Sequence, residues 1–168
     1  MDKKFNIIDT PGYLDFIGEA ISSLAVVDMA LVLLHAVNGV EVGSEQVWSY
    51  ATKNNIPKVL VVNGLDREHT KFDEILQQTK NHFGKTVFPM QLPVNAGPGF
   101  NQIVDVLRSE LITYQTDGSG KYTEADLPEE WQNRVEKLHQ ELIEYVAESD
   151  DTLPVSYTHL TLPTICSV

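Results

Sequence analysis

Short continuous runs of apolar residues recur along the first half of the chain, and each run is followed by residues that stop a strand. The runs at residues 5–8, 29–36 and 58–62 are typical of parallel strands buried on both faces of a sheet. A fourth strand candidate covers residues 86–92. Its Pro89 has no N–H to donate, which favours a position at the edge of the sheet. The pattern predicts four strands.

Between these runs, apolar residues recur every three or four positions, as on one face of a helix. The spacing predicts a short helix after Phe16, a helix that Ser44 caps and that ends before Pro57, and a third helix over residues 72–83. Alternating strands and helices over residues 5–93 predict an α/β domain with a parallel sheet and right-handed connections.

Beyond residue 95 the alternation changes. A Gly-rich loop at residues 95–99 precedes two apolar runs, 103–107 and 111–114, which we interpret as paired strands. A long amphipathic helix then begins near Pro128, with glutamates in its first turn. We expect a smaller α+β subdomain over residues 96–154.

The charge of the chain narrows the choice of partners. Twelve Lys and Arg against 24 Asp and Glu give a net charge of −12, which argues against strong nonspecific binding to DNA or RNA. The single cysteine, Cys166, cannot form an internal disulfide, and no segment has the pattern of a signal peptide or a membrane span. We expect no membrane partner, and the cytoplasm is the natural compartment.

The residues that follow two of the predicted strands carry candidate chemistry. Asp9-Thr10-Pro11-Gly12 follows the first strand, and Asn63-Gly64-Leu65-Asp66 follows the third. Ligands of open α/β sheets bind beyond the carboxyl ends of the strands, where one acid can face a phosphate-bound Mg²⁺ and another can accept the N–H donors of a guanine edge. Each motif taken alone also fits a simple turn. Their order together favours a guanine-nucleotide site.

Residues 5–150 resemble the GTP-binding domain of the elongation factor G family of translational GTPases. The matching blocks occur in the same order, namely Asp9-Thr10-Pro11-Gly12 with Asp15-Phe16, Asn38-Gly39-Val40-Glu41 before Ser44-Glu45, Asn63 to Asp66, and Met90-Gln91-Leu92-Pro93 followed by Ile103-Val104-Asp105-Val106. The resemblance implies a three-layer parallel sheet of the P-loop GTPase type over residues 1–95, followed by the start of an inserted subdomain. It also implies GTP and Mg²⁺ as cofactors, the ribosome as partner, and GTP hydrolysis coupled to translocation or to a variant of it.

The resemblance also implies roles for individual residues. Asp9 would contact Mg²⁺ through water, Thr10 and Pro11 would lie in the nucleotide-binding switch loop, and the Gly12 amide would sense the γ-phosphate. Asn63 and Asp66 would bind the guanine base. Tyr13 would stand at the catalytic position, where the family usually has a histidine that positions the attacking water.

Two departures from the family pattern concern this site. A phenol, with a reference pKa of about 10, cannot act near neutral pH as an imidazole does, so Tyr13 predicts slow or differently organised hydrolysis and indicates a divergent elongation factor G-like paralogue. Gly64 stands where the family has a lysine whose stem covers the guanine face, so we expect weaker base binding.

The phosphate-binding pattern Gly-x-x-x-x-Gly-Lys-Ser/Thr occurs nowhere in the sequence. In the family this loop and its strand precede the segment at Phe5, so we expect an incomplete GTP-binding domain that lacks its N-terminal strand and is poorly stable by itself. Two alternatives are a non-catalytic binding module of the same fold and a translational GTPase of the ribosomal-protection type.

Residues 155–168 do not continue the family pattern. The stretch from Val155 to Thr164 resembles the translation of a transposon-end sequencing adapter, which predicts a non-native tail. The alternative is a natural linker.

Overall fold

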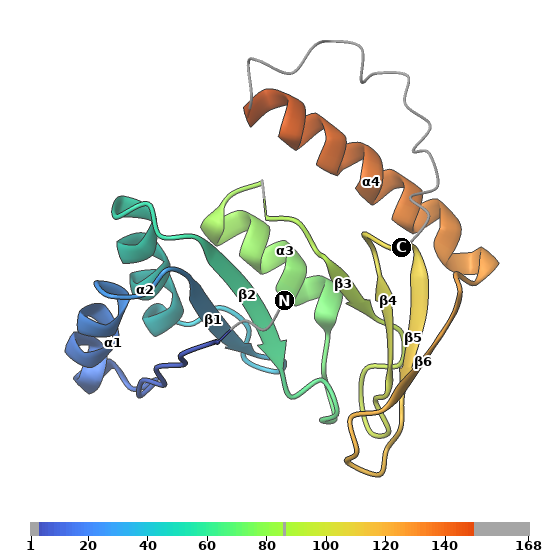
Figure 1. Ribbon diagram of the computed structural model, residues 1–168, viewed down its shortest axis with the longest axis horizontal. Helices are drawn as coiled ribbons and strands as arrows, with labels where there is room; N and C mark the ends of the chain where they lie inside the picture. Colours follow the sequence, from blue (N-terminus) through green and yellow to red (C-terminus); the bar gives the residue numbers. More distant parts are fainter. Residues whose placement is uncertain (1–3, 86, 150–168) are drawn as a thin grey trace.

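The computed structural model describes residues 4–85 and 87–149, so the predicted non-native tail lies outside the described residues. A short 3₁₀ helix, η1 (Leu14–Phe16), leads directly into α1 (Ile17–Leu24). The other elements follow in the order β1 (Ala30–His35), α2 (Val42–Lys53), β2 (Lys58–Asn63), α3 (Phe72–Phe83), β3 (Gln91–Pro93), β4 (Gln102–Asp105), β5 (Glu110–Tyr114), β6 (Tyr122–Asp126) and α4 (Glu129–Ser149). Figure 1 shows two parts that follow one another along the chain, a parallel strand pair with α1 to α3 and an antiparallel sheet with α4.

The first part is built on β1 and β2, which pair in parallel from Ala30↔Lys58 to His35↔Asn63. Alternate residues of β1 are buried, and Leu34 forms a core cluster with Ala36 and with Ile75 of α3. Both strands and the amphipathic helix α3 were predicted from the apolar pattern, and the structure confirms them. Because the pairing is parallel and in register, the carboxyl ends of β1 and β2 lie side by side.

The prediction that these strands are buried on both faces is wrong for the described residues. Leu31 and Leu33 of β1 are 57% and 62% exposed, and Val59 and Val61 of β2 also remain accessible. A third layer is therefore not formed by the described part of the chain. An apolar run shows that a strand can be buried, but it does not show what covers it.

The prediction of a first strand over residues 5–8 is also wrong for this structure. These residues have no regular structure, and Phe5 and Ile7 are 81% and 89% exposed. A strand needs a neighbour that accepts and donates its backbone hydrogen bonds, and β1 and β2 pair only with each other among the described residues.

The second part is an antiparallel sheet in the order β3-β4-β5-β6. The predicted pairing of the apolar runs near residues 103 and 111 is confirmed by the β4–β5 register, in which Ile103 faces Ile112. The fourth strand candidate behaves differently from its prediction. Among the described residues of the candidate, strand begins only at Gln91, and β3 (Gln91–Pro93) pairs with β4 rather than joining the parallel sheet. Pro89 has no N–H to donate to a ladder before it. The strand lies at the edge of the antiparallel sheet, so the predicted edge position in the parallel sheet is wrong.

Helix α4 covers one face of the antiparallel sheet and closes its core. Leu92, Val104 and Val106 are fully buried against Val135 and Leu138 of α4. Two ion pairs then join α4 to α3. Lys80 Nζ lies 3.3 Å from Glu141 Oε2, and Arg134 pairs with Asp73. The long amphipathic helix predicted after Pro128 is confirmed, and it holds the two parts of the molecule together.

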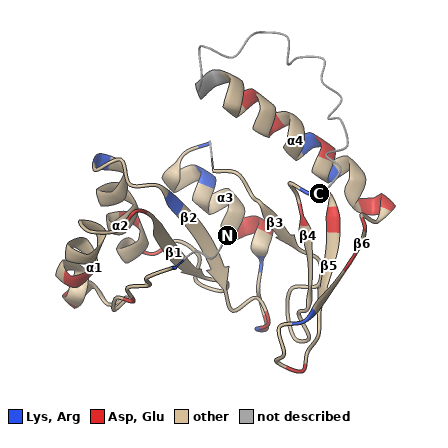
Figure 2. Ribbon diagram, in the orientation of Figure 1, with Lys and Arg blue, Asp and Glu red and all other residues tan. Residues whose placement is uncertain are grey.

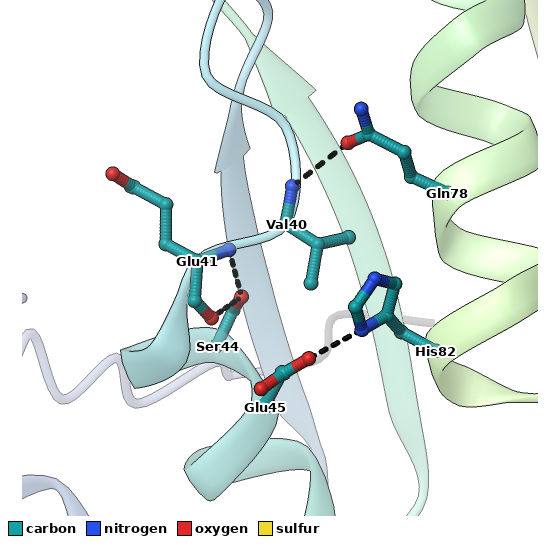
Figure 3. Close-up of polar contacts among 6 residues, drawn as sticks. All are labelled: Val40, Glu41, Ser44, Glu45, Gln78 and His82. Carbon is teal, nitrogen blue, oxygen red and sulfur yellow. Dashed lines mark hydrogen bonds and ion pairs between the residues drawn. The ribbon is translucent and has the colours of Figure 1, made fainter.

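The start of α2 differs in detail from its prediction. Its N-cap is Glu41 rather than Ser44, and Ser44 Oγ accepts a hydrogen bond from Glu41 N at 3.0 Å (Figure 3). Ser44 is the third residue of α2, and its hydroxyl satisfies the backbone N–H of the cap residue Glu41. Figure 3 also shows two links from α3 to this region, Gln78 Oε1 accepting from Val40 N and His82 paired with Glu45.

Figure 2 marks the Lys and Arg positions on the described ribbon, which are separated from one another by Asp, Glu and uncharged positions. Within the described residues, no helix combines the length and the hydropathy that crossing a membrane requires.

Candidate functional site

The carboxyl ends of β1 and β2 meet at one edge of the parallel pair, and the candidate guanine-binding residues lie there. Asn63 is the last residue of β2 and stands opposite His35, the last residue of β1. Its carbonyl oxygen accepts a hydrogen bond from Ala36 N at 2.8 Å, which ties the two strand ends together. The prediction that Asn63 follows directly from a parallel strand is therefore confirmed in position.

The loop after β2 turns sharply at Gly64. Asn63 Oδ1 accepts a hydrogen bond from Gly64 N at 2.9 Å, and Arg67 N donates to Gly64 O at 3.2 Å, which closes a turn around Asp66. Gly64 has a φ of +80°, a left-handed conformation that favours glycine. The Asp66 side chain is exposed, and none of the described hydrogen bonds or ion pairs uses it. A free carboxylate at this place can accept two N–H donors.

Arg67 and His35 border the space beside Gly64 at ordinary van der Waals distances. A Cβ added to Gly64 would lie 3.6 Å from Arg67 Cδ and 3.7 Å from His35 Nε2. The sequence motif indicates a missing lysine at Gly64 and gives no sign of a role for Arg67. Arg67 is the residue that lines this side of the loop.

The second candidate segment lies apart from this loop. Asp9, Pro11 and Gly12 are exposed and Thr10 is half-buried, while Tyr13 is 79% exposed and directly precedes η1. A Cβ added to Gly43 would lie 3.6 Å from Gly12 O, so the segment passes the first turn of α2. No hydrogen bond or ion pair joins residues 9–13 to residues 63–66 within the described chain. The expectation that Asp9 stands at the end of a strand is wrong here because residues 5–8 form none.

A groove in the described structure is lined by none of these candidate residues. It has a volume of about 680 Å³, lies between β2 with α3 and the antiparallel sheet, and is lined mainly by apolar side chains such as Val59, Val61, Phe88 and Ile103. Its few charged groups, Lys58 and Asp105, do not form an anion site. The described residues also contain no group of three His, Cys, Asp or Glu that is placed to hold a metal ion.

These features define a class of protein. Parallel strands joined by helices, with an Asn and a free Asp in the loop at one strand end, are typical of α/β nucleotide-binding domains. The family described as elongation factor Tu GTP binding domain matches residues 1–159. The crystal structure of the protein ttk003000868 from Thermus thermophilus is similar, with a TM-score of 0.78 and 33% sequence identity over 89% of this chain. This chain spans 22% of the length of that protein.

The chain belongs to the family of elongation factor Tu GTP-binding domains, and hence to the translational GTPases. The α/β fold with its parallel strand pair fits a P-loop GTPase. The resemblance inferred from the sequence motifs is therefore confirmed at the level of the translational GTPases.

Proposed function

We propose that this chain is part of the GTP-binding domain of an elongation factor G-like translation factor, of a divergent paralogue, acting in the cytoplasm on the ribosome. The observation that carries the proposal is the loop after β2. It presents the unpaired Asp66 carboxylate beside Asn63 at the shared carboxyl end of two parallel strands, in a chain of the translational GTPase family. Asn63 holds the turn, and Asp66 accepts the N–H donors of guanine.

Under this proposal, the groups that bind the phosphates are provided by sequence outside these 168 residues. The sequence lacks the phosphate-binding motif, and the exposed apolar residues Phe5, Ile7, Leu31 and Leu33 support a sheet that is completed by sequence outside these 168 residues. In that complete domain, the segment from Thr10 to Phe16 is the switch, and the Gly12 amide lies at the γ-phosphate. The 96–154 region is then the inserted subdomain.

Magnesium fits this arrangement only together with the nucleotide. Mg²⁺ prefers oxygen ligands, keeps several waters, and is commonly held by one or two carboxylates plus phosphates. Asp9 is a single exposed carboxylate, which suits contact through water rather than a cage of protein ligands. When bound, the ion neutralises charge on the phosphates.

Guanine selectivity is the direct test. In the full-length protein, meaning the gene product that includes the phosphate-binding loop, GDP is expected to bind at least about a hundredfold more tightly than ADP, since only guanine offers the two donors that Asp66 accepts. The 168-residue chain alone is expected to bind both nucleotides weakly, because most phosphate contacts are missing. Competition with a fluorescent GDP measures both. Equal affinity of the full-length protein for GDP and ADP contradicts the proposal.

Substitutions of Tyr13 distinguish the two candidate functions, a slow GTPase and a non-catalytic binding module. Tyr13→His is expected to raise GTP hydrolysis by the full-length protein at least about tenfold, because an imidazole with a reference pKa near 6.5 can accept a proton from water near neutral pH, whereas a phenol can only hydrogen-bond it. Single-turnover hydrolysis at saturating GTP measures the rate. The matched variant Tyr13→Phe removes only the hydroxyl.

A lower rate in Tyr13→Phe shows that the phenol already positions water. If both variants hydrolyse GTP at the wild-type rate while GDP binding persists, Tyr13 is not at the reacting phosphate and the non-catalytic module is favoured.

A further inference from the structure

The loop between β3 and β4, residues 94–101, is closed by the side chain of Asn95. Asn95 Nδ2 donates to Gly99 O at 3.1 Å and to Asn101 Oδ1 at 3.0 Å. Asn95 Oδ1 accepts from Asn101 N at 3.2 Å and from Gln102 N at 2.9 Å. One side chain thus makes four hydrogen bonds across a loop that has no regular structure.

Inside this closed loop, Gly97 to Phe100 form a tight turn. Phe100 N donates to Gly97 O at 3.0 Å, Pro98 occupies the second position of the turn, and Gly99 in the third has a φ of +84°. This is the pattern of a type II turn, in which proline and glycine each take their preferred place. This turn uses Gly97 O and Phe100 N, and does not use the Gly97 amide.

The Gly97 amide binds the candidate guanine loop. Gly97 N donates to Leu65 O at 2.7 Å, which joins the loop after β3 to the loop after β2, and Gly97 is buried at this contact with a φ of +115°. Figure 1 shows both loops at the same end of the molecule, beyond the tip of β2.

Leu65 is therefore held from two directions. Its side chain packs against the core cluster of Leu34 and Ile75, and its carbonyl is fixed by Gly97. Asp66 follows immediately in the chain. The loop after β3 is itself anchored to the antiparallel sheet, because Tyr114 N donates to Asn101 O at 2.8 Å and Asn101 Nδ2 donates to Tyr114 O at 3.3 Å.

We infer that Asn95 is a positioning residue for guanine recognition: it shapes the loop after β3 so that Gly97 holds the Leu65–Asp66 peptide in place for the base. The inference rests on the proposed function, and it adds that the antiparallel part takes part in base selection. A carboxylate that is already oriented loses less conformational freedom when it binds the base, which strengthens binding of guanine in particular.

The test compares Asn95→Ala with Asn54→Ala in the full-length protein. Asn54 is a matched control, because it is also exposed and its Nδ2 donates to Tyr50 O at the far end of α2. Asn95→Asp is a second variant that keeps the acceptor for Asn101 N and Gln102 N and loses the donor to Gly99 O and to Asn101 Oδ1. Asp66→Ala serves as the reference for loss of base recognition.

Three quantities are measured: the melting temperature, backbone hydrogen exchange of residues 63–70 without nucleotide, and the ratio of the affinities for GDP and IDP. Inosine lacks the 2-amino group of guanine, so the ratio reports on Asp66. Asn95→Ala is expected to speed hydrogen exchange in residues 63–70. It is also expected to lower the ratio of the GDP affinity to the IDP affinity about three- to tenfold, which corresponds to the loss of one hydrogen bond. Asn95→Asp is expected to lie in between, and Asn54→Ala to change neither.

The outcomes distinguish this inference from the proposed function. Wild-type exchange and a wild-type ratio in Asn95→Ala, together with a lowered ratio in Asp66→Ala, overturn the inference alone. An unchanged ratio in Asp66→Ala overturns guanine reading by Asp66, and the exchange data still decide whether Asn95 orders the loop. A lower melting temperature without faster local exchange assigns Asn95 a general structural role and also overturns the inference.

Discussion

Asp66→Asn is expected to change the nucleotide preference of the full-length protein from guanine to xanthine. A carboxylate accepts both N–H donors of the guanine edge, whereas an amide places an NH₂ group against the 2-amino group of the base. Xanthine has a carbonyl at that position and can accept from the amide. GDP affinity is expected to fall about a hundredfold, in line with the ~3 kcal/mol lost when one partner of a charge-assisted pair is removed.

Competition binding with GDP and XDP measures this change. Glu68→Gln is the control, since it removes another exposed negative charge from the same connection between β2 and α3. It is expected to leave the ratio of GDP to XDP affinity unaltered. If Asp66→Asn binds GDP as tightly as the wild type, Asp66 does not contact the base.

Leu92→Ala is expected to lower the free energy of unfolding of the antiparallel part by about 3 kcal/mol, in the range for a fully buried leucine. Leu92 is 0% exposed and lies in the cluster with Val104 and Val135. The alanine leaves a cavity between β3 and α4 that the paired strands cannot close by a small shift.

Urea unfolding followed by Trp131 fluorescence measures this loss, because Trp131 packs against that cluster. A Trp48→Phe background removes the other tryptophan signal. Leu107→Ala is the matched control; Leu107 is 47% exposed, and its truncation is expected to cost less than about 1 kcal/mol. Equal losses in the two variants would contradict the assignment of Leu92 to the core.

The parts of the fold that were predicted correctly depend on local patterns. Helix α3 and helix α4 each show apolar residues at helical spacing, and β1 and β2 are apolar runs with a stop signal after them. Residues 5–8 have the same local pattern as β1 but form no strand, because strand formation also depends on a partner that the pattern does not include.

The site divides in the same way. The turn at Asn63–Gly64 is encoded locally, since glycine provides the positive φ and the asparagine side chain binds the next amide. The position of Asp9 depends on contacts with distant segments, and so does the role of Asn95. The only local sign of a role for Asn95 is the Gly97-Pro98-Gly99 sequence. It indicates a turn, but it does not indicate that Gly97 N donates to Leu65 O.

The pairing of β1 only with β2 has a consequence for the chain when it is produced alone. Each of the two strands has one edge at which no described strand pairs with its backbone N–H and C=O groups. The exposed side chains of Leu31 and Leu33 lie on β1. Such an edge recruits strands from other molecules. Self-association of the isolated chain is therefore expected to rise with its concentration.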